Sequence, residues 1–396
     1  MKSTLNHPVL TLLANLPIGH LRLTLPSGET LTFGDHQHSL HAEINILDAT
    51  VLNAVRKSGD IGFAESYMAG HWTSPDVVRL LRLMLLNREA LERMIYGSWW
   101  GSLLYRIQHA FKRNSRSGSQ KNIHAHYDIG NSFYQLWLDP GMSYSSAWFN
   151  QTGALSSAQD AKINRALEQI KAAPGIRIAE IGCGWGALAE MAALQYGAYV
   201  DGITLSDEQL EWGLARMKRQ QIDKQADLMR LDYRDLPKRA KYAPYDAVVS
   251  IEMFEAVGKQ YWNDYFSVVF ESLKPSGRAC IQTITIRDDL FAKYERGTDF
   301  IQQYIFPGGF LPSDAEFKKA AQSAGLVVED VFAFGHDYAR TLAMWRSNFL
   351  AQETAVRALG FDTRFIKLWE FYLAYCEAAF FEGSTNVVQY TLRRSA

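Results

Sequence analysis

A glutamate and three glycines stand at two-residue spacing in AEIGCGWGALAE, residues 179–190. The motif, formed by Glu180, Gly182, Gly184 and Gly186, lies between a run of strand-like residues and a run of helix-forming residues. Glycines at such a junction let the backbone turn sharply and approach a ligand closely. The spacing is not the G-x-G-x-x-G of dinucleotide sites, and an acid two residues before the first glycine suits an amino-acid ammonium better than a pyrophosphate.

Polar residues also follow the next predicted strands. Thr204 and Gln209 in GITLSDEQ stand where a ribose or an adenine edge would lie, and Asp232 in RLDYRDLP is placed to accept from an adenine amino group. Each of them alone is better explained as a capping or loop residue. In order at successive strand ends, and together with the glycine motif, they predict a site for S-adenosylmethionine (SAM). The combination resembles the SAM motif of class I methyltransferases.

A polar residue also interrupts the predicted strand RACIQTITI, residues 278–286. Gln282 shares one face of this strand with Cys280 and Ile284, and a buried glutamine needs partners for two amide donors and an acceptor. Periodicity alone favours a satisfied polar residue near a strand end. At the crevice end of a sheet, the same residue becomes a candidate member of a catalytic site.

The elements that must position these residues alternate between strand and helix after about residue 125. Strands are predicted at GIRIAEIGC, AYVDGITL, YDAVVSIEMF and RACIQTITI, and helices at GALAEMAALQYG and SDEQLEWGLARMKRQQ. Gly197 is expected to close the first helix and Ser206 to cap the second. This alternation predicts a doubly wound α/β sheet with a ligand crevice at the carboxyl ends of its strands.

Two segments precede this sheet. Residues 1–97 are predicted to form a small mixed domain, with a hairpin in HLRLTLPSGETLTFGD and a helix in SPDVVRLLRLMLLNREALERMI. Residues 98–122 open with Trp99 and Trp100 and then carry Lys and Arg residues without one acid. This basic aromatic segment is either a solvated linker or a membrane-facing element with its cations on anionic head groups. Residues 123–396 form the predicted catalytic domain.

Bulk composition excludes several classes of protein. The 396 residues are 47% hydrophobic and 21% charged, which predicts a packed core and excludes global disorder. A formal net charge of −1 gives no global attraction to nucleic acid. Cys183, Cys280 and Cys376 lie far apart, so neither a disulfide framework nor a metal site is predicted, and a reducing, cytoplasmic location is expected. We find neither a signal-peptide pattern nor a membrane-spanning stretch, so a soluble or peripheral protein is expected.

Several longer motifs carry a resemblance to a known family. HYDIGNSFYQLWLDPGMSYSSAWF, IGCGWG, LDYRDL, SIEMFEAVG, YIFPGG and FGHDYARTLAMW are similar to motifs of the cyclopropane fatty acid synthase family. The resemblance covers essentially the whole chain, most strongly residues 122–392. It implies a class I SAM-dependent methyltransferase domain with a Rossmann-like, seven-stranded sheet, and a lipid-handling N-terminal domain. It also implies methyl transfer from SAM to a cis double bond in a membrane phospholipid acyl chain at the inner face of the cytoplasmic membrane. Family members are often dimers.

The resemblance assigns cofactor contacts residue by residue. Tyr144 and Ser145 would flank the methionine end of SAM. The remaining parts of SAM would be held by residues of the later motifs, namely Gly182, Thr204, Gln209 and Asp232.

The same resemblance implies a second small ligand, a bicarbonate ion that is the proposed base for ring closure. Glu255, Ile284 and Tyr338 match residues that line this ion. Two residues of its shell depart from the family, because Ser146 stands where the family has a cysteine and Gln282 where it has a histidine. Both can still hydrogen-bond an anion, but neither carries the positive charge that a histidine could offer. Glu255 could alternatively serve as the base directly.

This chemistry has physical requirements that the residues must meet. An alkene has no proton to remove, so the enzyme must hold it in line with the sulfonium methyl in a dry slot, and aromatic faces and a carboxylate can stabilise the resulting carbocation. Proton loss from the added methyl closes a cyclopropane, whereas proton loss from a neighbouring chain carbon would leave a methyl-branched or methylene product. Two alternatives stay open: a SAM methyltransferase of a small O or N acceptor, and a non-catalytic lipid-binding homologue.

Overall fold

The computed structural model describes residues 7–91, 129–150 and 152–395, and these form two compact units. The smaller unit comprises Met1–Phe111, Ala292–Pro307 and Leu342–Ser384, and the larger comprises Lys112–Phe291, Gly308–Thr341 and Thr385–Ala396. This division differs from boundaries at residues 97 and 123, because two later segments of the chain pack with the N-terminal elements. The basic aromatic segment, residues 98–122, lies outside the described residues.

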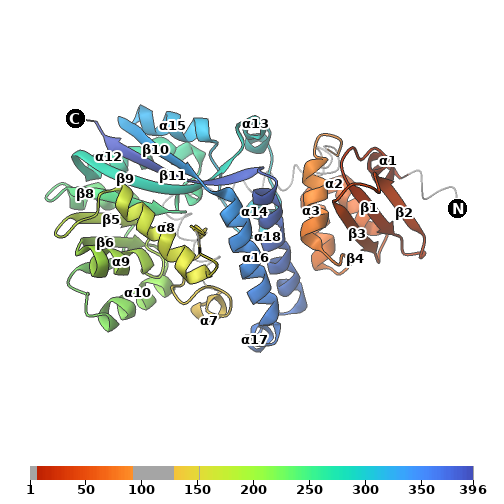
Figure 1. Ribbon diagram of the computed structural model, residues 1–396, viewed down its shortest axis with the longest axis horizontal. Coiled ribbons are helices and arrows are strands. Elements are labelled where there is room, and N and C mark those ends of the chain that lie inside the picture. The colour runs from red at the N-terminus through yellow and green to blue at the C-terminus, as the bar shows by residue number, and fades with distance from the viewer. Residues whose placement is uncertain (1–6, 92–128, 151, 396) are drawn as a thin grey trace. The chain divides into compact units, whose positions relative to one another are not determined.

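A seven-stranded sheet forms the centre of the larger unit, as predicted (Figure 1). Its strand order is β10-β11-β9-β8-β5-β6-β7, with β5 to β9 parallel and β11 antiparallel to both of its neighbours. The strands are β5 (Arg177–Ile181), β6 (Tyr199–Thr204), β7 (Ala226–Arg230), β8 (Tyr245–Ile251), β9 (Leu273–Ile286), β10 (Leu326–Ala333) and β11 (Thr385–Arg394). The parallel strands place their carboxyl ends at one edge, where a crevice is expected.

Helices cover both faces of this sheet because neighbouring strand residues point in opposite directions. On one face, Ile178 and Val249 pack with α8 (Leu155–Gln169), α9 (Ala187–Tyr196) and α10 (Asp207–Arg219). On the other, Ala179 and Val248 pack with α11 (Leu236–Ala240), α12 (Trp262–Ser272) and α15 (Asp314–Ser323). The unit also contains α7 (Asn131–Tyr134) and three 3₁₀ turns (Tyr233–Asp235, Phe254–Ala256 and Lys259–Tyr261).

The predicted helix ends are confirmed. The Ser206 hydroxyl caps α10 by accepting from the Gln209 backbone N–H, and Gly197 ends α9 in the left-handed conformation at φ 64°. The helices α13 (Asp288–Arg296) and α16 (Gly335–Ala351) each span a boundary between the two units in sequence.

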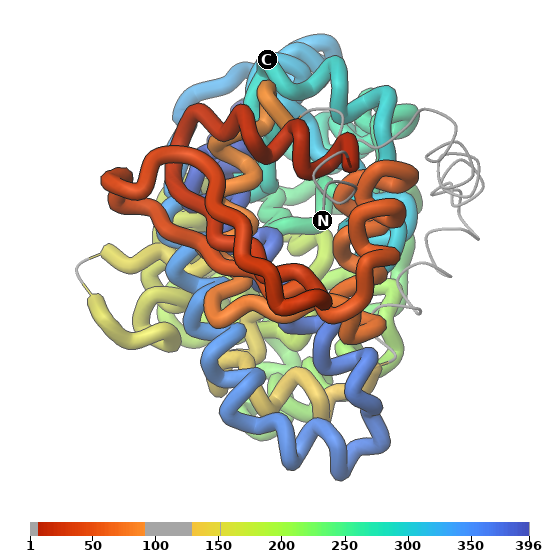
Figure 2. Tube along the Cα trace, turned by 90° about the vertical axis from the view of Figure 1, so that its right-hand side faces the viewer, coloured from red at the N-terminus to blue at the C-terminus, as the bar shows by residue number. Residues whose placement is uncertain are grey.

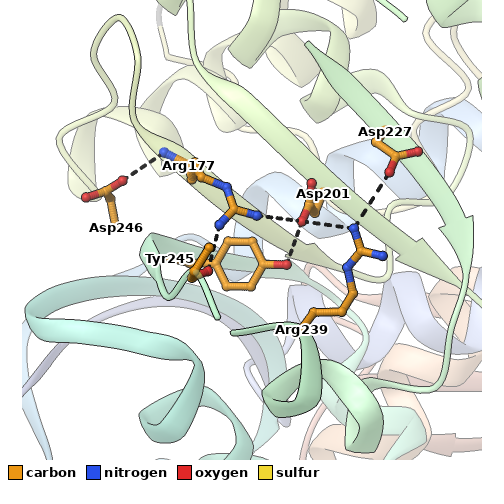
Figure 3. Close-up of polar contacts among 7 residues, drawn as sticks. Arg177, Asp201, Asp227, Arg239, Tyr245 and Asp246 are labelled. Carbon is orange, nitrogen blue, oxygen red and sulfur yellow. Dashed lines mark hydrogen bonds and ion pairs between the residues drawn. The ribbon is translucent and has the colours of Figure 1, made fainter. Parts of the chain in front are cut away.

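A polar cluster joins the amino-terminal halves of four strands of this sheet, and Figure 3 shows its side chains. Asp201 of β6 receives an Arg177 guanidinium N–H at 3.0 Å and the Tyr245 hydroxyl at 2.6 Å. Arg239 approaches the same carboxylate at 3.5 Å and Asp227 of β7 at 3.8 Å. This cluster links β5, β6, β7 and β8 to one another. It therefore stabilises the relative positions of the strands whose carboxyl ends form the crevice.

The smaller unit contains a four-stranded sheet in the order β2-β1-β3-β4. Its strands are labelled in Figure 1, and Figure 2 draws their part of the chain in red and orange. Its strands are β1 (His20–Thr24), β2 (Thr30–Gly34), β3 (His41–Ile46) and β4 (Trp72–Thr73), and the antiparallel pairing of β1 with β2 confirms the predicted hairpin. Among its described residues, the unit contains the helices α1 (Pro8–Leu13), α2 (Thr50–Met68), α3 (Val77–Leu86), α14 (Phe300–Tyr304), α17 (Glu353–Ala358) and α18 (Thr363–Phe381). Within the described ranges, we find no helix with the length and hydropathy needed to cross a bilayer.

Candidate active site

A pocket lies at the carboxyl ends of the central strands of the larger unit. Its lining includes seven of the residues predicted to bind the cofactor: Tyr144, Ser145, Glu180, Gly182, Gly184, Thr204 and Gln209. These come from three separate stretches of sequence, and the parallel strands bring them together. Seven of the nine predicted cofactor residues therefore line one pocket.

The glycine turn after β5 is built for close approach. Gly182 has φ 85°, and a Cβ there would lie 2.9 Å from the Met253 side chain. Gly184 has φ 52°, and a Cβ there would meet nothing within 4 Å. The N–H groups of Gly182 and Cys183 both donate to the Ile203 carbonyl at 3.0 Å, which holds the turn against β6. The turn thus leaves open space beside backbone, as a ligand cradle requires.

Glu180 is suited to an ammonium group. Its side chain is buried, and its Oε2 has no hydrogen-bond partner among the residues that the structure describes. Burial raises the pKa of Glu180 to about 8, although Lys162 and Arg216 oppose this shift. A buried, unsatisfied carboxylate in a pocket is a costly arrangement unless a ligand donates to it. The amino-acid end of SAM supplies such a donor, so these residues fit the cofactor.

Lys162 on α8 is a lining residue that sequence reasoning missed. Its ammonium donates to the Ser145 hydroxyl at 2.6 Å and is fully buried. Burial lowers the pKa of Lys162 to about 8, while Glu252, Asp139 and Glu180 act in the opposite sense. Helical spacing could have revealed it, because Lys162 stands four residues from two small residues that are both buried, Ala158 and Ala166.

Two predicted cofactor residues are not among those that line the pocket. Gly186 ends the glycine turn as the N-cap of α9, and a Cβ there would lie 3.0 Å from the Met217 methyl group. The Asp232 carboxylate accepts the Arg234 Nε at 2.7 Å and caps the 3₁₀ turn at Tyr233–Asp235. A contact of Asp232 with adenine therefore stays a prediction.

A second group of predicted residues gathers around Glu252, which directly follows β8 and lines the pocket. Its Oε1 accepts the Ser146 backbone N–H at 2.8 Å and the Gln282 amide at 2.7 Å. Its Oε2 accepts the Tyr338 hydroxyl at 2.7 Å. Three of the five predicted catalytic residues thus donate to one carboxylate that was not itself predicted.

The other two predicted catalytic residues contact each other. The Ile284 backbone N–H donates to Glu255 Oε1. Burial and the charge of Glu252 raise the pKa of Glu255 to about 8. Burial also raises the pKa of Glu252, whereas its hydrogen bonds and Lys162 oppose that rise. The three donors and the nearby cation favour the charged form of Glu252, and that charge together with burial favours the protonated form of Glu255.

The orientation of the Gln282 amide follows from its neighbours. Arg165 can only donate, and its Nη1 donates to Gln389 Oε1 at 2.8 Å. The Gln389 amide must then present its N–H groups to Gln282, and it donates to Gln282 Oε1 at 3.0 Å. Gln282 is left with its own N–H groups facing Glu252. A relay of donors from Arg165 therefore ends on the Glu252 carboxylate.

Comparison with known proteins gives a consistent result. The family model for mycolic acid cyclopropane synthetase matches residues 114–390. Tuberculostearic acid methyltransferase of Mycobacterium tuberculosis is 36% identical over 350 residues, covering 86% of this chain and 80% of that protein. Cyclopropane-fatty-acyl-phospholipid synthase of Escherichia coli is 33% identical over 343 residues, covering 86% of this chain and 85% of the relative.

A solved structure agrees with the fold and the cofactor. Mycolic acid cyclopropane synthase CmaA1 in complex with SAH and CTAB matches with a TM-score of 0.63 and 29% identity, over 69% of this chain and 98% of that one. SAH is what SAM becomes when it gives up its methyl group, so the match supports the class I SAM-binding fold. The chain belongs to the mycolic acid cyclopropane synthetase family and is a SAM-dependent methyltransferase.

Proposed function

We propose that this enzyme transfers the methyl group of SAM to a cis double bond in an unsaturated fatty acyl chain of membrane phospholipid. We use the name catalytic corner for Glu252, which lines the cofactor pocket, together with its neighbours Ser146 and Gln282. The observation that carries the proposal is that Ser146 and Gln282 are fully buried, so this corner is shielded from solvent. Relatives named for fatty-acyl phospholipid and for tuberculostearic acid support the acceptor class.

The residues of this corner suit an acceptor that has no proton to give up. Methyl transfer to an alkene needs alignment and exclusion of water, and it leaves a carbocation on the acyl chain. Tyr144 and Trp185 line the pocket, and both pack against Tyr134 with ring centroids 5.4 and 5.3 Å away. Aromatic faces attract a cation without forming a bond to it. A carboxylate beside them adds electrostatic stabilisation.

The product depends on which proton is lost. Loss from the added methyl closes a cyclopropane ring. A hydride shift before that loss leaves a methylene group, and loss from a chain carbon leaves a methyl branch beside a double bond. Because Ser146 and Gln282 replace the cysteine and histidine implied for the family's site, we favour a methyl-branched or methylene product.

A labelling experiment tests both parts. The enzyme is incubated with SAM carrying a CD₃ group and with vesicles of unsaturated phospholipid, and the acyl products are separated by mass and NMR. A chain that retains three deuterons is methyl-branched, whereas two deuterons indicate a ring or a methylene group, which NMR separates. A cyclopropane would refute the branched product but keep the alkene acceptor. Label found only on O or N of a polar acceptor would refute both the alkene acceptor and the methyl-branched or methylene product.

Membrane attachment is part of the same proposal. A phospholipid acyl chain is reached from a bilayer surface, so the enzyme is proposed to lie peripherally on the inner face of the cytoplasmic membrane, with the smaller unit handling lipid. The cations Arg106, Lys112 and Arg113 are proposed to contribute to docking. Charge reversal of these three should weaken binding to anionic vesicles in a sedimentation assay. Unchanged vesicle binding would remove this docking role.

A further inference from the structure

Glu252 holds an unusual backbone conformation. Its φ is 50°, in the left-handed region that a residue with a Cβ rarely adopts. Its backbone N–H donates to the Gln282 carbonyl at 2.8 Å, and its side chain accepts the Gln282 amide. The backbone and the side chain of Glu252 are thus both hydrogen-bonded to Gln282 on β9. Strain of this kind persists where surrounding contacts over-determine it, and such positions concentrate at functional sites.

The residues expected to hold bicarbonate do not fit a separate anion here. The Ser146 N–H, the Gln282 amide and the Tyr338 hydroxyl each donate to Glu252, and the Ile284 N–H donates to Glu255. The Ser146 hydroxyl donates to the Ala147 carbonyl at 3.0 Å. An added anion would compete for these donors beside a charged carboxylate, which repels it. The carboxylate of Glu252 already has the hydrogen bonds that such an anion needs.

We propose that Glu252 replaces bicarbonate as the base of this enzyme. The inference rests on the proposed alkene acceptor. A bond forms between an alkene carbon and the methyl carbon as the methyl–sulfur bond breaks, which leaves a cation on the acyl chain. Glu252 then takes a proton from carbon, and the electron pair of that C–H bond closes the ring or forms the new double bond. The neutral acid returns its proton to solvent before the next turnover.

The surroundings of Glu252 support this role. Burial makes it a stronger base than an exposed carboxylate, while its three donors and Lys162 keep it charged. Glu255, with a pKa of about 8, stays protonated and does not repel the charge on Glu252. The relay from Arg165 through Gln389 and Gln282 aims an N–H at the carboxylate and fixes its position.

Two substitutions at Glu252 distinguish the loss of its charge from the loss of its volume. Glu252→Gln removes the charge but keeps the volume. Glu252→Gly removes both, and glycine accepts the φ of 50° without strain, so the fold is retained. It also releases the Ser146, Gln282 and Tyr338 donors. We expect both variants to lose product formation about 100-fold or more, the usual scale for a general base. Only Glu252→Gly should regain activity when bicarbonate is added.

The measurements are made with the full chain, in CO₂-free buffer with and without bicarbonate. Wild-type product formation should be the same in both. Line broadening of ¹³C-bicarbonate should appear with Glu252→Gly and be absent with the wild type, and SAM binding by calorimetry should be retained in each. Bicarbonate-dependent wild-type activity, or a wild-type rate in Glu252→Gln, would overturn the inference. If the wild type forms no acyl product in either buffer, the proposed function itself fails, which is a distinct result.

Discussion

Gln282 and Gln389 lie opposite each other in register on β9 and β11, and the Gln389 amide donates to Gln282 Oε1 at 3.0 Å. This contact decides which end of Gln282 faces Glu252, because Arg165 occupies the other side of Gln389. A residue on the antiparallel strand therefore positions a group in the catalytic corner without touching the acceptor itself.

Replacing Gln389 with leucine should separate positioning from stability. The variant removes the acceptor of Arg165 Nη1 and the donor to Gln282 Oε1, so the free energy of unfolding should fall by about 1–3 kcal/mol. Product formation should fall about tenfold while the Kd for SAM stays unchanged, because a misplaced catalytic group affects the chemical step. Thr391→Val is the matched control. Thr391 lies on β11, as Gln389 does, and its hydroxyl donates to Gln169 of α8 at 3.0 Å, so this variant also removes a hydrogen bond of β11. Equal losses of kcat in both variants would contradict a positioning role.

Glu180→Gln should weaken SAM binding. The substitution keeps the shape of the side chain but removes the charge that faces an ammonium, and we expect the Kd to rise about tenfold, which corresponds to ~1.4 kcal/mol. Isothermal titration calorimetry measures this directly. Glu190→Gln serves as the control, because Glu190 pairs with Arg216 and is not among the lining residues. A similar loss in both variants would show that general electrostatics, not a direct contact, governs affinity.

Two glycines with nearly the same φ test the close approach at the cofactor turn. Gly182 and Gly175 have φ 85° and 84°, but a Cβ would meet the Met253 side chain at 2.9 Å only at Gly182. Both alanine variants should lose about 1–2 kcal/mol of stability from backbone strain. Gly182→Ala should lose more, and it alone should lose SAM affinity. Thermal unfolding and calorimetry on the pair measure the two effects, and matching results would argue against the steric explanation.

Glu255→Gln should change how stability depends on pH. The pKa of Glu255 is about 8 in the folded protein, against a reference value of 4.5, so the folded state binds more protons than the unfolded state between these values. Stability from this group is therefore present at low pH and is lost as the pH rises towards 8. The variant should show a shallower decline, by up to about 1.4 kcal/mol per pH unit. Urea titrations from pH 5 to 8 test this, and parallel slopes would contradict the shift.

Much of the fold was predictable because it depends on local patterns. Strand and helix alternation identified the doubly wound sheet, and the caps at Ser206 and Gly197 follow from the chemistry of single residues. The division into units was less predictable. Residues 292–307 and 342–384 pack with the N-terminal elements, and such long-range packing leaves no local mark in the sequence.

The active site divides in the same way. The glycine turn, Glu180 and the polar residue in RACIQTITI could be predicted from the amino-acid sequence, because backbone freedom and the burial pattern of one strand depend on neighbouring residues. The hydrogen bond from Gln282 to Glu252 could not be predicted in this way, because it needs β8, β9 and β11 to pair in one register. Glu252 also gains Ser146 and Tyr338, which are 106 and 86 residues away in sequence. Hydrogen bonds between distant segments form only once the sheet exists, and here they give the Glu252 carboxylate its three donors.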